Sequence, residues 1–203
     1  MQVIVDRVDF RYRRRSVLQR FSAVFERNTV TALVGPSGSG KSTVLSLLAG
    51  HTRPQAGAVW FCSETERHRA SPRDATWIAQ DANVLAARSV LDNVRIGPLS
   101  EGCGLGEATR RAEQALVDVG LDTFASQTCR SLSGGERQRV VIARSLASTR
   151  AVMIADEPTS GLDEGNTRVV ADLFAAVQGR ATVIIATHDP VIMDAAAALV
   201  RLR

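Results

Sequence analysis

The sequence of 203 residues contains one lysine, one tyrosine and three cysteines, and aromatic residues make up only 4% of it. The cysteines Cys62, Cys103 and Cys129 are odd in number and lack the spacing of metal ligands, which argues against a closed disulfide framework and against a structural zinc site. Such cysteine usage favours a reducing cytoplasm. No apolar run reaches about 18 residues, and the first residues lack the basic and apolar regions of a signal peptide. We therefore expect a soluble cytoplasmic protein that is not exported and does not cross a membrane by itself.

The charge balance is basic, with a formal net charge of +4 and an isoelectric point near 9.6. The arginines are spread along the chain and no aromatic stacking motif accompanies them, so we expect no nucleic-acid partner. The densest arginine cluster, residues 11–15, is typical of a solvated face or of a patch near a partner. With 45% hydrophobic residues the chain is long enough for one sizeable core, and we expect a single domain over residues 1–203.

A glycine-rich stretch directly follows the apolar residues 29–34 and has the pattern G-x-x-x-x-G-K-[ST] of a P-loop. Its members are Gly35, Pro36, Ser37, Gly38, Ser39, Gly40, Lys41, Ser42 and Thr43. Glycines allow the loop to turn its backbone N–H groups around an anion, the lysine places a charge on the phosphates, and the serine hydroxyl is a ligand for Mg²⁺. A simple turn between a strand and a helix would not require a lysine at this spacing. The stretch therefore predicts a site for nucleotide phosphates.

Two further groups of polar side chains follow apolar runs. Asp156 and Glu157 come after residues 151–155, and His188 comes after residues 181–186. Such runs are typical of parallel strands buried on both faces, and ligands bind at the carboxyl edge of such sheets. One carboxylate is expected to hold Mg²⁺ and the other to face the attacking water. A lone histidine is usually a packed or surface residue, but in this position we expect it to sense the phosphate.

The remaining patterns predict an α/β fold with a mixed, largely parallel core sheet, an N-terminal antiparallel β lobe and an inserted helical lobe at about residues 84–148. Residues 1–26 alternate in part, which predicts short antiparallel strands that turn around residues 13–16. A short half-buried helix is expected after the P-loop, up to Gly50. The other predictions are a strand at residues 58–62, a connecting loop at 63–73, and helical segments at 89–94 and 107–119 separated by a loop at 97–106.

Residues 131–139 read S-L-S-G-G-E-R-Q-R and precede a second helical pattern. Ser133 and Glu136 have the spacing of a capping box, which would only start a helix. Two glycines in the first turn each reduce helix propensity by about 1 kcal/mol, a cost that a simple cap would avoid. Gly134 and Gly135 are therefore expected to leave the amides of the helix N-terminus uncovered as a second anion site.

The motif L-S-G-G-E at residues 132–136 resembles the signature of ABC-type ATPases, and the other motifs follow in the order of that family. These are an aromatic A-loop residue (Tyr12), Walker A (residues 35–43), the Q-loop (Gln80), Walker B with its glutamate (residues 152–157), the D-loop (residues 160–163) and the H-loop (His188). From spacing alone, Tyr12 would be a packing residue and Gln80 a surface amide. The resemblance covers essentially the whole chain and implies a P-loop NTPase fold.

The resemblance also implies the cofactors ATP and Mg²⁺ and a role for each matching residue. Tyr12 is expected on the adenine, Ser42, Gln80 and Asp156 on Mg²⁺, and Glu157, His188 and Gln80 in catalysis. The signature residues Ser133, Gly134, Gly135 and Glu136, together with Asp163, are expected to meet the nucleotide of a second nucleotide-binding subunit in a head-to-tail dimer. The family further implies separately encoded ABC transmembrane subunits that hold the protein at the cytoplasmic face of the cell membrane.

Besides the ATP-hydrolysing subunit of a transporter, two other functions are alternative interpretations of the sequence. A soluble ABC-type ATPase of translation, DNA repair or cofactor assembly would usually carry two cassettes or a long coiled coil, whereas this chain has one cassette and no sustained heptads. A kinase-like phosphotransferase would not explain the signature motif. The chain ends directly after its last apolar run, so we expect no C-terminal regulatory extension.

Overall fold

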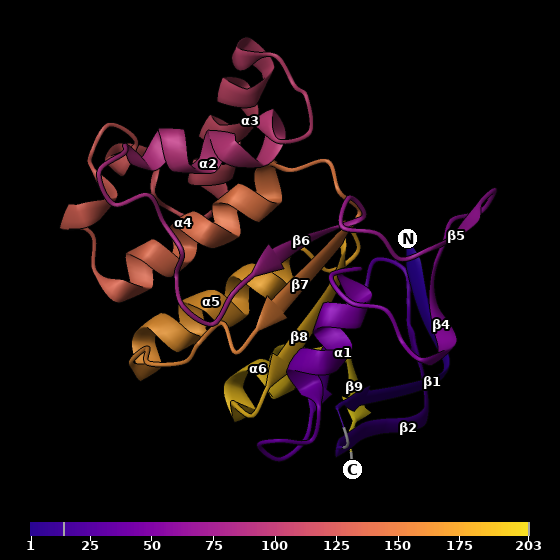
Figure 1. The fold of residues 1–203 in the computed structure, drawn as a ribbon. Helices are drawn as coiled ribbons and strands as arrows, with labels where there is room; N and C mark the ends of the chain where they lie inside the picture. Colours follow the sequence, from indigo (N-terminus) through magenta and orange to yellow (C-terminus); the bar gives the residue numbers. More distant parts are fainter. Residues whose placement is uncertain (14, 203) are drawn as a thin grey trace. The chain divides into compact units, whose positions relative to one another are not determined.

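The structure is a computed structural model that describes residues 1–13 and 15–202 (Figure 1). Arg14, which belongs to the predicted arginine cluster, and Arg203 lie outside the described residues. The chain divides into two compact units. The α/β unit comprises Met1–Trp77, Arg150–Glu157 and Phe174–Arg203, and the helical unit comprises Ile78–Thr149 and Pro158–Leu173. The single domain over residues 1–203 and the lobe bounds of 84–148 stay predictions.

One sheet of the α/β unit is antiparallel, with the strand order β2-β1-β4-β5. The strands are β1 (Gln2–Tyr12), β2 (Arg15–Phe25), β4 (Ala56–Cys62) and β5 (Arg67–Arg69). The β1–β2 hairpin confirms the predicted antiparallel pair, but its strands are 11 residues each rather than short, and shifts of register interrupt the alternation. The loop predicted at residues 63–73 is wrong in part, because β5 lies within it. This polar segment is a strand through its pairing with β4, in which His68 lies opposite Phe61.

The second sheet has the order β6-β7-β8-β3-β9, and β3 pairs in parallel with both β8 and β9, as β7 does with β8. Its strands are β3 (Val30–Val34), β6 (Ala75–Ile78), β7 (Val152–Asp156), β8 (Thr182–Thr187) and β9 (Ala198–Arg201). Every residue of β3 and β8 is buried, as the continuous apolar runs predicted. Helix α1 (Lys41–Leu48) packs on β7 and β8, and α6 (Pro190–Ala195) follows β8. These two sheets confirm the predicted α/β fold class.

The helical unit is built on three helices that pack pairwise, α2 (Val90–Leu99), α3 (Leu105–Asp118) and α4 (Gly134–Ala147). Short 3₁₀ turns at Asp122–Phe124 and Cys129–Ser131 join them, and most of α5 (Glu164–Ala176) also belongs to this unit. The loop predicted at residues 97–106 is wrong at both ends, because α2 includes Gly97 and Pro98 and α3 begins at Leu105. A Cβ at Gly97 would collide with the backbone carbonyl of Arg144 on α4, so the glycine allows two helices to approach closely instead of ending one.

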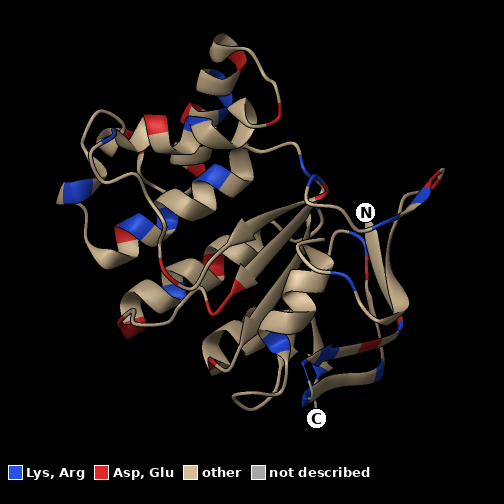
Figure 2. Cartoon of the chain, in the orientation of Figure 1, with Lys and Arg blue, Asp and Glu red and all other residues tan. Residues whose placement is uncertain are grey.

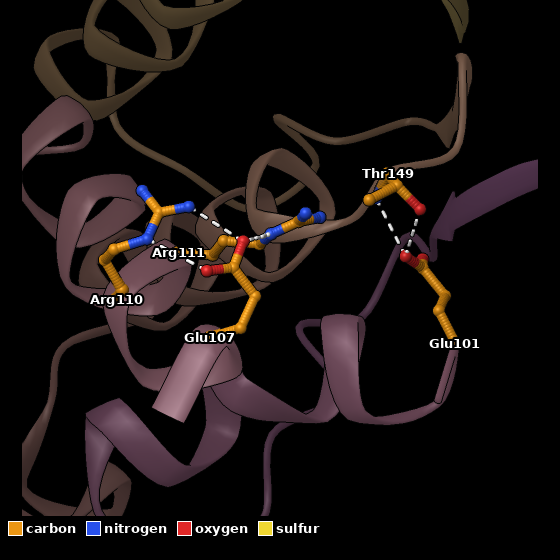
Figure 3. A network of polar contacts seen from close by, with 5 residues as sticks. All are labelled: Glu101, Glu107, Arg110, Arg111 and Thr149. Carbon is orange, nitrogen blue, oxygen red and sulfur yellow. Dashed lines mark hydrogen bonds and ion pairs between the residues drawn. The ribbon is translucent and has the colours of Figure 1, made fainter. Parts of the chain in front are cut away.

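Side-chain hydrogen bonds hold these helices together. The guanidinium of Arg144 donates to the backbone oxygens of Asn83 and Asn93, both at 2.9 Å, and to Oδ1 of Asn93 at 3.0 Å. On the surface, Glu107 accepts from two arginines of its own helix, Arg110 and Arg111 (Figure 3). Among the described residues, no helix is long and apolar enough to span a bilayer.

Candidate functional site

The predicted catalytic groups of the α/β unit lie at the carboxyl ends of three neighbouring strands. Lys41 begins the helix that follows β3, Asp156 is the last residue of β7, and His188 directly follows β8. Because β7, β8 and β3 are adjacent and parallel, these ends meet at one edge of the sheet. The fold therefore brings together side chains that are up to about 150 positions apart in the sequence.

The P-loop between β3 and α1 forms a cradle. Gly38 and Gly40 have φ angles of 80° and 100°, values that strongly favour glycine. A Cβ at Gly35 would lie 2.7 Å from Oγ of Ser39 and 2.9 Å from the backbone oxygen of Leu202, so this glycine is required by space. The Oγ of Ser39 is buried and has no hydrogen-bond partner among the described residues. A phosphate oxygen would supply the missing partner, so the loop fits a nucleotide.

Lys41 is 9% exposed and points back over the loop. Its Nζ donates to the backbone oxygen of Gly35 at 2.8 Å and lies 3.5 Å from Oε1 of Glu157. The ammonium thus sits between the start of the P-loop and the carboxylate that follows β7. A cation in this position can bind a phosphate held by the loop.

Glu157 is fixed by its backbone and by both of its carboxylate oxygens. It has a φ of 45°, which is uncommon for a residue with a side chain, and its N–H donates to the backbone oxygen of Ala186 at 2.8 Å. Its Oε2 lies 2.9 Å from Nδ1 of His188 and accepts from the backbone N–H of His188 at 3.3 Å. A strained backbone held by the adjacent strand is typical of a functional residue.

Asp156 and Ser42 form a pair suited to a divalent cation. The Asp156 side chain is hydrogen-bonded to Ser42, yet burial raises the pKa of Asp156 above its ordinary value. A nearby cation would therefore stabilise the ionised carboxylate. No cluster of three or more histidine, cysteine, aspartate or glutamate side chains that could hold a metal ion occurs among residues 1–13 and 15–202. This donor set fits Mg²⁺, which binds through one or two protein oxygens, phosphates and waters.

The start of β2 lies against the P-loop, a relationship that the sequence reasoning missed. Nη2 of Arg15 is 4.0 Å from the position that a Cβ of Gly38 would take, and Cγ1 of Val17 is 2.8 Å from that of Gly40. Tyr12 is paired with Arg15 across the hairpin and is 55% exposed, with an edge contact to the ring of Phe10 at 4.9 Å. The arginine cluster was the only sequence signal for this contact.

The predicted site residues of the helical unit lie at the start of α4. Ser133 caps this helix and forms a capping box with Glu136, whose Oε2 accepts from the Ser133 N–H at 2.7 Å. This hydrogen bonding lowers the pKa of Glu136. A Cβ at Gly134 would meet only open space, whereas one at Gly135 would collide with the side chain of Asn166. The two glycines therefore have different structural roles. Gly135 is required by its contact with Asn166, and only Gly134 leaves the helix N-terminus exposed.

The two remaining predicted residues also belong to the helical unit. Asp163 accepts from the backbone N–H and the side-chain amide of Asn166, at 2.8 and 2.7 Å, so it acts as a cap for α5. These hydrogen bonds lower the pKa of Asp163. Gln80 donates from Nε2 to Oγ of Ser160 at 3.2 Å. The predicted roles of Gln80 with Mg²⁺ and of Asp163 with a nucleotide stay predictions.

Comparison with known proteins gives one family. The model of the ABC transporter family matches residues 18–160. The chain is 38% identical over 182 residues to the cell division ATP-binding protein FtsE of Escherichia coli strain K12. This match covers 86% of this chain and 82% of FtsE. It is 37% identical over 198 residues to the phosphonates import ATP-binding protein PhnC 2 of Rhodopseudomonas palustris. This match covers 91% of this chain and 70% of PhnC 2. The solved structure of cbiO1 from Clostridium perfringens, part of the ABC transporter complex cbiONQ, superposes with a TM-score of 0.87 at 25% identity and covers 99% of this chain and 84% of cbiO1.

Proposed function

The chain belongs to the ABC transporter family as an ATP-binding subunit with ATPase activity, and we propose that it hydrolyses Mg²⁺-bound ATP in a head-to-tail dimer attached to membrane subunits. The observation that carries the mechanism is the continuous chain of contacts from Lys41 through Glu157 to His188 at one edge of the sheet. These contacts support a site in which a cation, a carboxylate and an imidazole act together on one γ-phosphate.

Each group has a defined task in this proposal. The P-loop amides and Lys41 hold the phosphates, and Glu157 orients and polarises the attacking water. His188 keeps the Glu157 carboxylate in position through Nδ1 and turns Nε2 toward the γ-phosphate. Catalysis of this kind depends on positioning and charge stabilisation, because phosphoryl transfer to water needs little covalent help from the protein.

Ser42 and Asp156 would hold the magnesium ion, and Gln80 would complete the set. Burial of Asp156 without a full counter-charge supports this assignment. When bound, the ion would neutralise charge that develops on the phosphate oxygens.

The exposed signature segment supports the proposed dimer. Ser133 and Gly134 are exposed at the N-terminus of a 14-residue helix, where backbone N–H groups attract an anion. We propose that this end of α4 meets the γ-phosphate of a second subunit, so that each P-loop is half of a composite site. The membrane subunits would then keep the dimer at the cytoplasmic face of the membrane.

The test measures ATP turnover and association state of the purified chain with and without Mg²⁺. We expect Mg²⁺-dependent turnover, lost in Lys41→Ala through weaker binding. In Glu157→Gln we expect turnover to fall roughly 10²- to 10⁴-fold, with ATP binding retained and a dimer trapped by ATP. Arg27→Ala, which removes a surface charge paired with Glu64, is the matched control.

Full turnover in Glu157→Gln would overturn the assignment of the base. A chain that stays monomeric with ATP and Glu157→Gln would overturn the dimer. Co-purification with membrane subunits that stimulate turnover is the expected result for attachment to a transporter, and full activity with only soluble partners would contradict it.

A further inference from the structure

We propose that Arg15 is a second phosphate-binding cation of the nucleotide site and holds the polyphosphate from outside the P-loop. This inference rests on the ATP-binding function stated above. It gives a role to one member of the arginine cluster at residues 11–15, which the mechanism so far does not use.

The guanidinium of Arg15 lies beside the P-loop. Nη2 of Arg15 lies 4.0 Å from the place of a Cβ on Gly38, and apart from the residues next to Gly38 no other described residue comes within that distance of this place. Val17, two residues along β2, packs beside Gly40 at 2.8 Å. Residues two apart on a strand share a face, so the beginning of β2 presents this face to the loop. The guanidinium is therefore directed at the loop that binds phosphate.

The positive charge of Arg15 is not balanced by a neighbouring acidic side chain in the described part of the chain. None of the ion pairs among residues 1–13 and 15–202 includes Arg15. Arg7 and Arg27, from the same sheet and its loops, are paired, since Arg7 lies 3.1 Å from Asp6 and Arg27 contacts Glu64. In Figure 2 basic residues gather where β1 and β2 meet, beside the start of α1. Arg15 thus brings an uncompensated positive charge to the P-loop, whereas Lys41 already faces Glu157.

The position of Arg15 also fits the order of the chemical groups along a nucleotide. Tyr12 pairs with Arg15 across the hairpin and exposes its ring, and Lys41 lies at the far end of the loop. A nucleotide with its base on Tyr12 and its terminal phosphates on Lys41 would pass Arg15 with its inner phosphates. A guanidinium can bind two phosphate oxygens at once, which an ammonium cannot do with fixed geometry.

The test compares dissociation constants for ADP, a non-hydrolysable ATP analogue and adenosine, each measured by titration with Mg²⁺ present. In Arg15→Ala we expect binding of both phosphorylated ligands to weaken roughly fivefold, since the contact is charged but exposed, and adenosine binding to stay unchanged. Arg15→Lys should recover part of the loss. The dependence of ADP binding on salt should also become less steep in Arg15→Ala.

Two control variants each remove one positive charge elsewhere. Arg11→Ala removes it from the arginine cluster, and Arg27→Ala removes it from a surface ion pair. Both variants should bind ADP as the native chain does. Circular dichroism should show an unchanged fold for every variant, because each side chain is exposed. Unchanged ADP affinity in Arg15→Ala, an equal loss in Arg11→Ala, or an equal loss for adenosine would each overturn the proposal. Native protein that binds neither ADP nor the ATP analogue would overturn the proposed function itself, which is a different result from failure of Arg15 alone.

Discussion

Nζ of Lys41 lies 3.5 Å from Oε1 of Glu157, and both side chains are at most 15% exposed. The charge that is expected to bind phosphate and the carboxylate that is expected to polarise water therefore neutralise one another. A nucleotide must compete with Glu157 for this ammonium, and its phosphates must also approach a carboxylate.

Glu157→Gln should accordingly bind ADP more tightly than the native chain, by roughly fivefold, because it removes both the competitor for Lys41 and the repulsion of phosphate. ADP keeps this measurement separate from hydrolysis. The control is Glu164→Gln, which removes an exposed carboxylate paired with Arg168 on α5. Equal affinity of Glu157→Gln and native protein would show that the pairing does not oppose binding.

Asp156→Asn should raise the melting temperature by a few degrees at neutral pH without metal ions or nucleotide. Burial raises the pKa of Asp156, so the folded chain holds the proton more firmly than the unfolded chain does. The ionised carboxylate therefore lowers the free energy of unfolding, and this cost grows as the pH rises through the two pKa values. The gain in melting temperature of Asp156→Asn should shrink as the pH falls toward and below about 4. There the Asp156 carboxyl of the native sequence becomes protonated in both the folded and the unfolded chain, and its cost disappears.

The same variant should lose the additional stabilisation that Mg²⁺ gives to the ATP-bound chain. A melting temperature that falls in Asp156→Asn at neutral pH without ligands would contradict the predicted cost of the buried carboxylate. Loss of Mg²⁺ stabilisation is a separate measurement and tests the metal assignment.

The glycines of the signature segment should separate folding from dimer formation. Gly135→Ala places a methyl group against Asn166, so it should lower the melting temperature of the monomer by several degrees. Gly134→Ala meets open space and should leave the melting temperature unchanged or slightly raised. If this end of α4 meets a second subunit, Gly134→Ala should still bind ATP but form less ATP-dependent dimer. Normal dimer formation and turnover in Gly134→Ala would contradict a close approach there.

The surface cluster of Glu107, Arg110 and Arg111 (Figure 3) should matter little to folding. Hydrogen bonds from Arg110 and Arg111 lower the pKa of Glu107 to about 2. The stabilisation is therefore present above the ordinary pKa of a glutamate and is lost as the pH falls through about 2. Because the group is exposed, Glu107→Gln should lower the melting temperature by no more than about two degrees at pH 7.

That difference between Glu107→Gln and native protein should disappear near pH 2 and diminish in high salt. A loss of many degrees at neutral pH would contradict this small contribution of the contacts within α3.

The buried strands and the P-loop could be predicted because their signals are local. Residues 151–155 and 181–186 are continuous apolar runs, and the glycines and Lys41 have a spacing with one strong chemical interpretation. The meeting of Glu157 and His188 at one sheet edge followed from the parallel strands that precede them. The resemblance then added expected functions for the weakly marked positions, such as Gln80.

What the sequence could not predict depends on contacts between distant segments. Residues 67–69 have no apolar alternation and form β5 only by pairing with β4. Gly97 resembles a loop residue until the carbonyl of Arg144 is seen beside it. Gly135 is explained by Asn166, and the place of Arg15 by the packing of β2 on the P-loop. Each of these contacts is set by tertiary packing, which local propensity does not encode.

The solitary lysine also makes the protein a convenient subject for chemical labelling. An amine-directed acylating reagent can modify only Lys41 and the α-amino group of this chain. Lys41 is 9% exposed and hydrogen-bonded to Gly35, so its modification should be slow, and a nucleotide over the loop should slow it further. The extent of acylation at this one position, read by mass spectrometry, would report occupancy of the P-loop directly, without any engineered probe.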